Sequence, residues 1–367
     1  MRTITGTDLT LTYPDELCFA FNPVLCIVGA LATSLRINVT CDGETYTADY
    51  SGMAGGQKIY GDMQQFCQRF FDGIDFSLDY SQGMTDTGLG KEMSFEVIAG
   101  HVSGRSETFT FTTFVIWGAK RWGKDTFNGF RVVKMWEGYP FTFGLYAQGG
   151  GTLLVASGQA PRTPVAITED GMLAISSAIF PDDAEFVTLY DYAGTLQQGV
   201  FDGTFDLTFY MYQNVVQTLL ARIDIDRCPN EDGVYLRWID RHGFWCYWLF
   251  ENRQEQRTTN AVQDFTRPNL QGYTPEFGYQ RGAGRRAAYT RGGVLPLAAT
   301  LVDETLYDYL FDVASSPVVD MYLGKDENDV EQWIGVQVQA GTFARTDQPL
   351  QDFVINLVLP TYNVQRL

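Results

Sequence analysis

Short stretches of alternating hydrophobic and polar residues recur along the chain, and turn-forming residues separate them. In an early example, residues 35–40 and 45–50 flank Asp42-Gly43, a pair that readily adopts the positive φ angles of a tight hairpin turn. This spacing is typical of antiparallel sandwiches and barrels, and it differs from the alternation of strands with long helices in βαβ units. The pattern therefore predicts a mainly β protein with multidomain antiparallel β-sandwiches.

The C-terminal region carries further predicted strands. From Ile334 to Ala340 every second residue is hydrophobic, so one face of this strand is expected to be buried and the other solvated. Residues 326–330 are predicted to form the hairpin tip before it. The last strand is predicted over Phe353–Leu359 and is expected to end at Pro360, which lacks the amide hydrogen that a β-ladder uses.

Two segments have the period of an amphipathic α-helix instead. The first segment is Asp62–Phe71, and Gly73 is expected to end this helix. The second segment is Asp303–Ala314, in which Asp303 is the expected N-cap and Pro317 follows the end. In both segments the hydrophobic residues fall three and four positions apart, on one helix face. They are Met63, Phe66, Cys67, Phe70 and Phe71 in the first segment, and Leu306, Tyr309, Leu310, Val313 and Ala314 in the second. The chain is therefore expected to hold two short amphipathic helices.

The most unusual segment is an aromatic hairpin over residues 233–250, with its turn at Asp240–Gly243. Hydrophobic side chains occupy both faces of its returning strand, so each face must be covered. Two interpretations remain open: the hairpin is the centre of a two-layer core, or it is half of a permanent subunit interface. The candidate core or interface residues are Trp238, Phe244, Trp245, Tyr247, Trp248 and Phe250.

Composition narrows the class of protein. Hydrophobic residues make up 45% and charged residues 19%, which excludes intrinsic disorder. The net charge of −18 disfavours nucleic-acid recognition, because an acidic surface repels phosphate. Residues 227–291 run against this trend, with ten Lys or Arg against seven Asp or Glu, a net charge of +3 that leaves −21 elsewhere. Such asymmetry suits contacts between copies or with partners.

A chain of 367 residues is expected to hold two or three domains. We place a β-rich domain at residues 1–118, a middle β domain or insertion at 119–200 and a C-terminal β-sandwich domain at 201–367. The first residues lack the basic and apolar segments of a secretory signal, and the apolar segment 24–32 is too short to cross a membrane. No membrane insertion is expected, and the protein is expected to be made in a cytoplasm.

The cysteines are expected to be reduced and mostly buried, since most lie within apolar runs and a chain of this size needs no disulfide framework. They are Cys18, Cys26, Cys41, Cys67, Cys228 and Cys246. The sequence contains no Cys-x-x-Cys and only two histidines, so it predicts no zinc site.

No motif for catalysis or cofactor binding is complete. His101 and His242 lie beside no nucleophile motif and are interpreted as strand-end and turn residues. Acidic pairs such as Asp75 and Asp79 are the residues of glycoside hydrolysis, but 44 acidic residues produce such pairs by chance. The segment 224–229 departs from a calcium loop, and the Gly-rich segments lack the spacing of nucleotide loops. We therefore predict no catalytic residue, no metal and no cofactor.

A Gly-rich stretch, Pro268–Gly293, is predicted to be irregular, and loops of this length are usually functional or ordered by a partner. Guanidinium groups pair bidentately with carboxylates, so the arginines of this stretch are suited to grip a neighbouring copy. The alternative is a solvated loop. The candidate assembly contacts are Arg281, Arg285, Arg286 and Arg291.

The aromatic hairpin, with Tyr235–Ile239 and Trp245–Phe250, resembles a hairpin of structural proteins from tailed bacteriophages and prophages of gut Bacteroidetes. From about residue 224 onward, the chain is similar in kind to tail-tip, distal-tail and baseplate proteins: a helix, a break at Ser316-Pro317, the Trp333–Gly341 strand and a final strand ending at Pro360. The resemblance rests on packing patterns. It implies a β-sandwich subunit that forms a ring or collar in a virion tail, with no catalytic residues.

These observations predict a virion structural protein in an oligomeric tail-tip, baseplate or tail ring, made in the bacterial host cytoplasm. Its expected partners are copies of itself in a ring and other tail proteins, which suits an acidic β-rich chain without catalytic motifs. Two alternatives stay open. One is a carbohydrate-binding adhesin or receptor-binding module, whose exposed aromatic residues stack on host-surface glycans. The other is a glycan-cleaving enzyme that uses two carboxylates.

Overall fold

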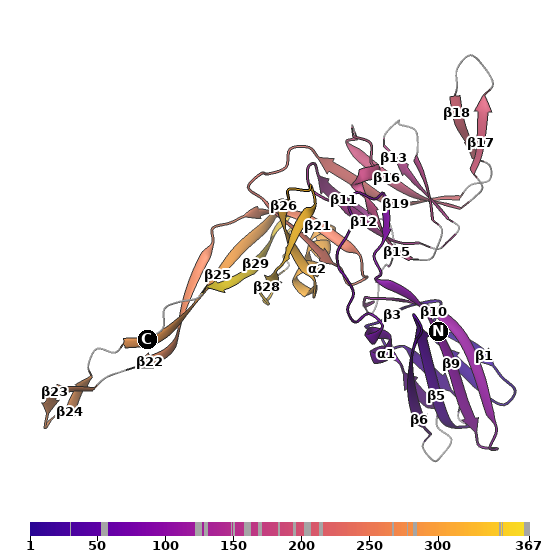
Figure 1. The fold of residues 1–367 in the computed structure, drawn as a ribbon, viewed down its shortest axis with the longest axis horizontal. Coiled ribbons are helices and arrows are strands. Elements are labelled where there is room, and N and C mark those ends of the chain that lie inside the picture. Colours follow the sequence, from indigo (N-terminus) through magenta and orange to yellow (C-terminus); the bar gives the residue numbers. More distant parts are fainter. Residues whose placement is uncertain are drawn as a thin grey trace. The chain divides into compact units, whose positions relative to one another are not determined.

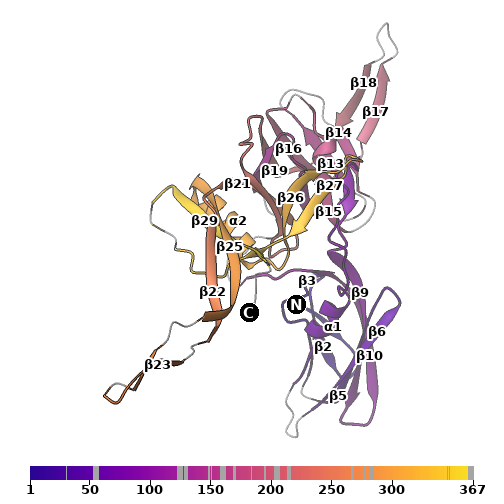
Figure 2. The same ribbon diagram turned by 60° about the vertical axis from the view of Figure 1, so that its left-hand side comes forward.

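The protein is mainly β, with several antiparallel sheets and two short α-helices among the described residues, which confirms the predicted fold class. The structure is a computed structural model (Figures 1 and 2). It describes residues 1–29, 31–52, 58–121, 127, 131–147, 149, 151–157, 163–167, 171–182, 184–193, 196–201, 207–212, 216–265, 268–276, 278–281, 285–344, 346 and 348–362. None of the described helices is long and apolar enough to cross a membrane.

The chain divides into two compact units. Unit 1 comprises Met1–Cys228 and Ile239–Cys246, whereas unit 2 comprises Pro229–Trp238 and Tyr247–Leu367. The turn of the aromatic hairpin therefore belongs to unit 1, and the rest of that hairpin belongs to unit 2.

Unit 1 begins with a β-sandwich, drawn in indigo to purple in Figure 1. One sheet has the order β1-β2-β4-β7, and the other has the order β3-β10-β9-β5-β6. The pairing of β3 with β10 is parallel, and the other pairings are antiparallel. The elements are β1 (Arg2–Thr5), β2 (Thr10–Tyr13), β3 (Leu17–Phe19), β4 (Leu25–Val28), β5 (Ala32–Cys41), β6 (Glu44–Ser51), β7 (Ile59–Asp62), α1 (Gln64–Arg69), β9 (Gly90–His101) and β10 (Ser106–Ile116).

One hydrophobic cluster fills the space between these two sheets. Leu11 and Val28 reach it from the first sheet, Ile37 and Val97 from the second, and Cys67 from α1. The cluster forms because apolar residues at alternating positions of these strands point inward. Helix α1 lies within the predicted Asp62–Phe71 segment, so that prediction is confirmed with shorter bounds.

The predicted Asp42-Gly43 hairpin is also confirmed. β5 and β6 pair from Ser34 with Ser51 to Cys41 with Glu44. Asp42 and Gly43 have φ angles of 51° and 82°, the left-handed region that Asp-Gly turns adopt at low cost.

The remainder of unit 1 is built from smaller sheets with the orders β11-β19-β16-β13-β14 and β12-β15-β8, and from the β17-β18 hairpin. β19 pairs with β11 and β16, so this sheet extends past residue 200, where the sequence placed a domain boundary. The elements are β8 (Met84–Asp86), β11 (Arg131–Trp136), β12 (Thr142–Ala147), β13 (Thr152–Ala156), β14 (Thr163–Ala166), β15 (Gly171–Ser176), the 3-10 turn Ser177–Ile179, β16 (Phe186–Ala193), β17 (Leu196–Phe201), β18 (Leu207–Tyr212) and β19 (Val216–Asp226).

Unit 2 is a sheet with the order β27-β26-β20-β21-β25-β29-β28, and α2 packs on it. Tyr309 of α2 contacts the Trp238 ring at 5.4 Å between centroids, and Tyr307 contacts Phe353 at 5.1 Å. The predicted cap is confirmed, because the Asp303 carboxylate accepts from the Leu306 amide at 2.8 Å. The elements are β20 (Val234–Ile239), β21 (Trp245–Asn252), β22 (Gln256–Phe265), β23 (Pro268–Thr274), β24 (Gly278–Arg281), β25 (Arg285–Val302), α2 (Glu304–Ser315), β26 (Val319–Lys325), β27 (Glu331–Gly335), β28 (Gln337–Val338) and β29 (Gln351–Tyr362).

Three predictions for this region were wrong. The Pro268–Gly293 stretch is not irregular, because β23, β24 and the first part of β25 occupy most of it. The strand with Ile334 does not bury that residue, which is 43% exposed, since β27 lies at the edge of the sheet. The last strand continues past Pro360 to Tyr362, where the register against β25 shifts.

Candidate interaction surfaces

A two-stranded ribbon extends the sheet of unit 2. β21 pairs with β25 at Glu251–Ala298 and Asn252–Leu297, and β22 continues along the same strand from Gln256–Val294 to Phe265–Arg285. On its other side, β25 pairs with β29, whose last partner pair is Tyr362–Arg291. Among the described residues, positions 285–290 of β25 therefore pair with β22 alone.

This ribbon and the β23-β24 hairpin that joins its strands form what we name the arm, residues 256–292. The outer edge of β22 and the outer edge of residues 285–290 of β25 have no strand partner among the described residues. Open edges are templates for pairing with another chain, and a two-stranded ribbon by itself is only marginally stable in water. The arm therefore has the geometry of an element that a partner covers.

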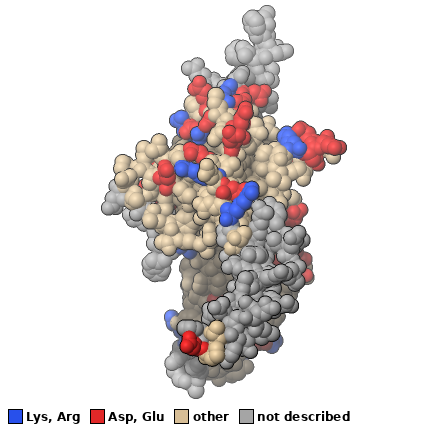
Figure 3. All heavy atoms as spheres, turned by 90° about the vertical axis from the view of Figure 1, so that its left-hand side faces the viewer, with Lys and Arg blue, Asp and Glu red and all other residues tan. Residues whose placement is uncertain are grey.

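The candidate assembly arginines all lie on the arm. Arg281 is in β24 opposite Pro268, and Arg285, Arg286 and Arg291 are in β25 opposite Phe265, Asp264 and Thr259. Their side chains lie outside the described residues. The arm contains six arginines against two acidic residues, a net charge of +4, so the remainder of the chain carries −22. On the face in Figure 3, Asp and Glu cover more of the coloured surface than Lys and Arg do.

The aromatic hairpin is covered by the chain itself. Its candidate residues are 0–4% exposed, apart from the half-buried Trp248: Trp238, Phe244, Trp245, Tyr247 and Phe250. At the turn, the Asp240 carboxylate accepts from the amides of His242 and Phe244 at 2.9 and 2.8 Å, and Gly243 has a φ angle of 84°.

The hairpin turn, Ile239–Cys246, is integral to the core of unit 1. The Phe244 ring stacks on Phe127 at 5.6 Å, and the Arg131 guanidinium lies 4.5 Å from the centre of the same ring. His242 is 6% exposed and lies against Phe19. The Ala119 amide donates to the Arg241 carbonyl at 2.6 Å. These contacts place the turn within the packing of unit 1.

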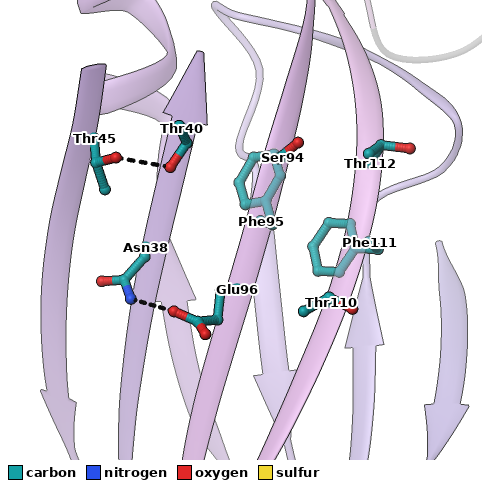
Figure 4. Close-up of a pocket in the computed structure, with 9 residues that line it drawn as sticks. All are labelled: Asn38, Thr40, Thr45, Ser94, Phe95, Glu96, Thr110, Phe111 and Thr112. Atoms are coloured by element: carbon teal, nitrogen blue, oxygen red, sulfur yellow. Dashed lines mark hydrogen bonds between the residues drawn. The ribbon is translucent and has the colours of Figure 1, made fainter. Parts of the chain in front are cut away.

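The outer face of the sandwich sheet β6-β5-β9-β10 holds an open depression of about 560 Å³ (Figure 4). Hydroxyl, amide and carboxylate side chains line it, together with two phenylalanines whose rings pack with the core of the sandwich. The lining residues are Asn38, Thr40, Thr45, Ser94, Phe95, Glu96, Thr110, Phe111 and Thr112. Sequence reasoning missed this site, although alternation of Thr and Ser with apolar residues in β9 and β10 marks the outward face.

Glu96 is the charged group of the depression, and its neighbours hold it in place. Asn38 donates from Nδ2 to the Glu96 Oε2 at 2.7 Å, while Thr47 donates from Oγ1 to the Asn38 Oδ1 at 2.8 Å. The hydroxyls of Thr40 and Thr45 bond to each other at 2.8 Å. None of the nine lining residues is a cation, so the depression is a cluster of hydroxyl and amide groups around one negative charge.

The other sites that sequence reasoning considered gain no catalytic geometry. The His101 Nδ1 bonds the Ser103 hydroxyl at 2.7 Å within the β9-β10 turn, and accepts from the Ser103 amide. Asp75 and Asp79 each bind the amide and hydroxyl of the serine two positions on. These bonds lower the pKa of both carboxyls and keep both ionised. Among the described residues, no three His, Cys, Asp or Glu side chains are placed to hold a metal ion.

All six cysteines are free thiols, and Cys228 is exposed. Burial raises the pKa of Cys18 and Cys26 to about 12 and that of Cys41 to about 11. We expect a maleimide at pH ~8 to modify Cys228 and to spare the buried thiols until the protein is denatured, because the thiolate is the reactive form. Peptide mass spectrometry of native and denatured samples checks this. Rapid native labelling of Cys26 would contradict it.

The same pKa shifts predict loss of stability in alkali. A thiol in the unfolded chain titrates near ~8.5, whereas Cys18 and Cys26 stay protonated in the fold until about 12. Above pH ~8.5 the unfolded state therefore binds fewer protons than the native state, and the free energy of unfolding falls as the pH rises.

No protein-family model matches the chain, and no curated protein matches it. One solved structure to which the chain has a weak likeness comes from work described as "Structural insight into host cell surface retention of a 1.5-MDa bacterial ice-binding adhesin". The match covers 89% of this chain and 95% of that chain, at 11% sequence identity and a TM-score of 0.18. A likeness at this level carries no argument about fold or function.

Proposed function

We propose that this chain is a structural subunit that assembles with copies of itself, as a virion protein in the tail of a bacteriophage. The observation that carries the proposal is the arm: a ribbon with open edges and a net charge of +4 on a chain whose remainder carries −22. Complementary charge orients copies and speeds their encounter. The assignment to a phage tail rests in addition on the resemblance of the sequence from about residue 224 onward to tail proteins.

The rest of the chain suits a subunit of this kind. The sandwich of unit 1 has its own continuous core, and α2 covers the sheet of unit 2, so both units offer rigid surfaces to neighbours. The aromatic hairpin is buried within the chain, which leaves the arm as the stronger candidate for contact between copies. A repeated contact between the arm of one copy and another surface of the next is heterologous, and such contacts close into rings when the rotation between copies allows it.

The test is charge reversal on the arm. Wild-type protein is expected to form oligomers whose mass rises with concentration in light scattering, with rings in negative-stain microscopy. Arg285→Glu with Arg286→Glu is expected to leave a folded monomer, because it removes the positive charge of the ribbon. Lys58→Glu with Arg105→Glu changes the net charge equally at two exposed residues of unit 1 and is the matched control. A wild-type protein that stays monomeric at every concentration refutes the proposal.

A further inference from the structure

We infer that the arm of one copy docks on the depression around Glu96 in a second copy, with arm arginines directed at the Glu96 carboxylate. This inference rests on the proposed function and names the surface that receives the arm. It commits to a second copy of this chain as the occupant.

The receiving surface is a regular array of small polar side chains on four paired strands. The registers of β6, β5, β9 and β10 place the outward residues in rows that cross the sheet. The depression lies on two of these rows, Thr45-Thr40-Ser94-Thr112 and Thr47-Asn38-Glu96-Thr110, of which Thr47 is outside its lining. Because none of these side chains is large, the face leaves room for the backbone and side chains of another β-element.

Glu96 is the single acidic or basic residue in these two rows. In the next row, Arg36 already pairs with Asp49 at 2.7 Å through Nε, and donates to the other oxygen at 3.2 Å through Nη2. The Arg36–Asp49 pair has no net charge, so it does not neutralise the negative charge of Glu96. The bonds from Thr47 to Asn38 and from Asn38 to Glu96 hold the carboxylate before a partner arrives, which lowers the entropy lost on binding.

Guanidinium groups fit this site better than sugars do. A carboxylate surrounded by hydroxyls accepts the forked hydrogen bonds of an arginine. Sugar sites usually present an open aromatic face. Here the Phe95 ring is 2% exposed and stacks on Phe111 at 4.9 Å with 5° between the planes, so the rings face each other.

The charge and the width of the arm also match those of the receiving face. Residues 1–118, which hold the sandwich, contain six Lys or Arg and 14 Asp or Glu, a net charge of −8 against the +4 of the arm. A two-stranded ribbon is about 10 Å wide, and the face of four strands is about 19 Å wide, because strands lie ~4.8 Å apart. The ribbon therefore fits within the face without reaching its edges.

The experiment reverses the charge of the receiving surface in the full chain. Glu96→Lys is expected to raise the concentration for half-assembly by about tenfold or more in light scattering, since it places two cations together. Glu92→Lys changes an exposed residue on the same face of β9 outside the depression, and we expect a change below about twofold. Circular dichroism of both variants confirms that they are folded.

Mixing separates docking between copies from docking within one chain. Glu96→Lys retains an intact arm, and the Arg285→Glu, Arg286→Glu variant retains an intact depression. If the arm binds a second copy, an equimolar mixture of the two variants is expected to regain assembly with alternating copies. A mixture that stays monomeric overturns the inference.

The outcomes distinguish this inference from the proposed function. Loss of assembly in the arm variant with normal assembly in Glu96→Lys overturns the inference alone. A wild-type monomer overturns the proposed function and the inference together. Glycan-array binding by the wild type that Glu96→Lys abolishes, with assembly unchanged, overturns the inference in favour of a sugar at the depression.

Discussion

Replacing Asp320 with alanine is expected to lower the free energy of unfolding of unit 2 by about 3–5 kcal/mol. Asp320 lies directly opposite Arg237 across β26 and β20, and its carboxylate binds the Arg237 Nε at 2.9 Å. The Arg237 side chain is 6% exposed and lies 4.3 Å from the centre of the Trp333 ring. Asp320→Ala removes the Asp320 carboxylate from this buried guanidinium, which water reaches poorly.

Urea unfolding, with hydrogen exchange to report each unit separately, measures the effect. Arg253→Ala is the matched control in the same unit, because the Arg253–Asp352 pair is about half exposed and 3.8 Å long. We expect a change below about 1 kcal/mol for this control. The double variant Arg237→Met, Asp320→Leu tests the cause: removing both charges is expected to recover most of the loss. Equal losses in Asp320→Ala and Arg253→Ala would show that burial of the pair does not matter.

Local chemistry explains the elements that the sequence predicted. Helix α2 was predictable because the Asp303 cap and the spacing of its apolar residues both act within one or two turns of the helix. The β5-β6 hairpin was predictable because Asp42-Gly43 determines the turn without help from distant residues. Predictions from such local signals do not depend on which strands pair in the fold.

The mistaken elements depend on neighbours that a pattern does not reveal. The alternation around Ile334 predicts a buried face, but β27 is an edge strand and Ile334 stays exposed. The stretch Pro268–Gly293 was taken for a loop because its sequence is rich in Gly and Arg and shows no alternation of apolar residues. Its strands show only once β22 and β25 are paired.

The proposed contact also depends on register. Asn38 and Glu96 are 58 residues apart in sequence, and they meet because β5 pairs with β9. A shift of one residue in that pairing would turn Glu96 toward the core and remove the depression. The arginines that we propose to bind it were visible in the sequence as a basic segment, whereas their binding surface was not.

Phe244→Ala is expected to destabilise unit 1 by about 3–5 kcal/mol, although residue 244 lies in a hairpin whose strands belong mainly to unit 2. Its ring is 2% exposed, stacks on Phe127 and covers the Arg131 guanidinium. Truncation to alanine leaves a cavity and removes the aromatic face that the arginine contacts. Gly144 of β12 packs directly against this side chain, since a Cβ added at Gly144 would lie 2.8 Å from the Phe244 Cβ.

Phe250→Ala is the matched control, since it makes the same substitution six residues later, in β21, at a side chain that is 0% exposed. Because Phe250 belongs to unit 2, we expect the same loss to appear in unit 2 and not in unit 1. Hydrogen exchange measured by mass spectrometry assigns each loss to its peptides. If both variants weaken the same peptides equally, the two units unfold as one. If each variant weakens only the peptides of its own unit, a single hairpin supplies core residues to both units. Cleaving the peptide chain at the turn of this hairpin should then destabilise unit 1, while the strands of the arm in unit 2 stay paired.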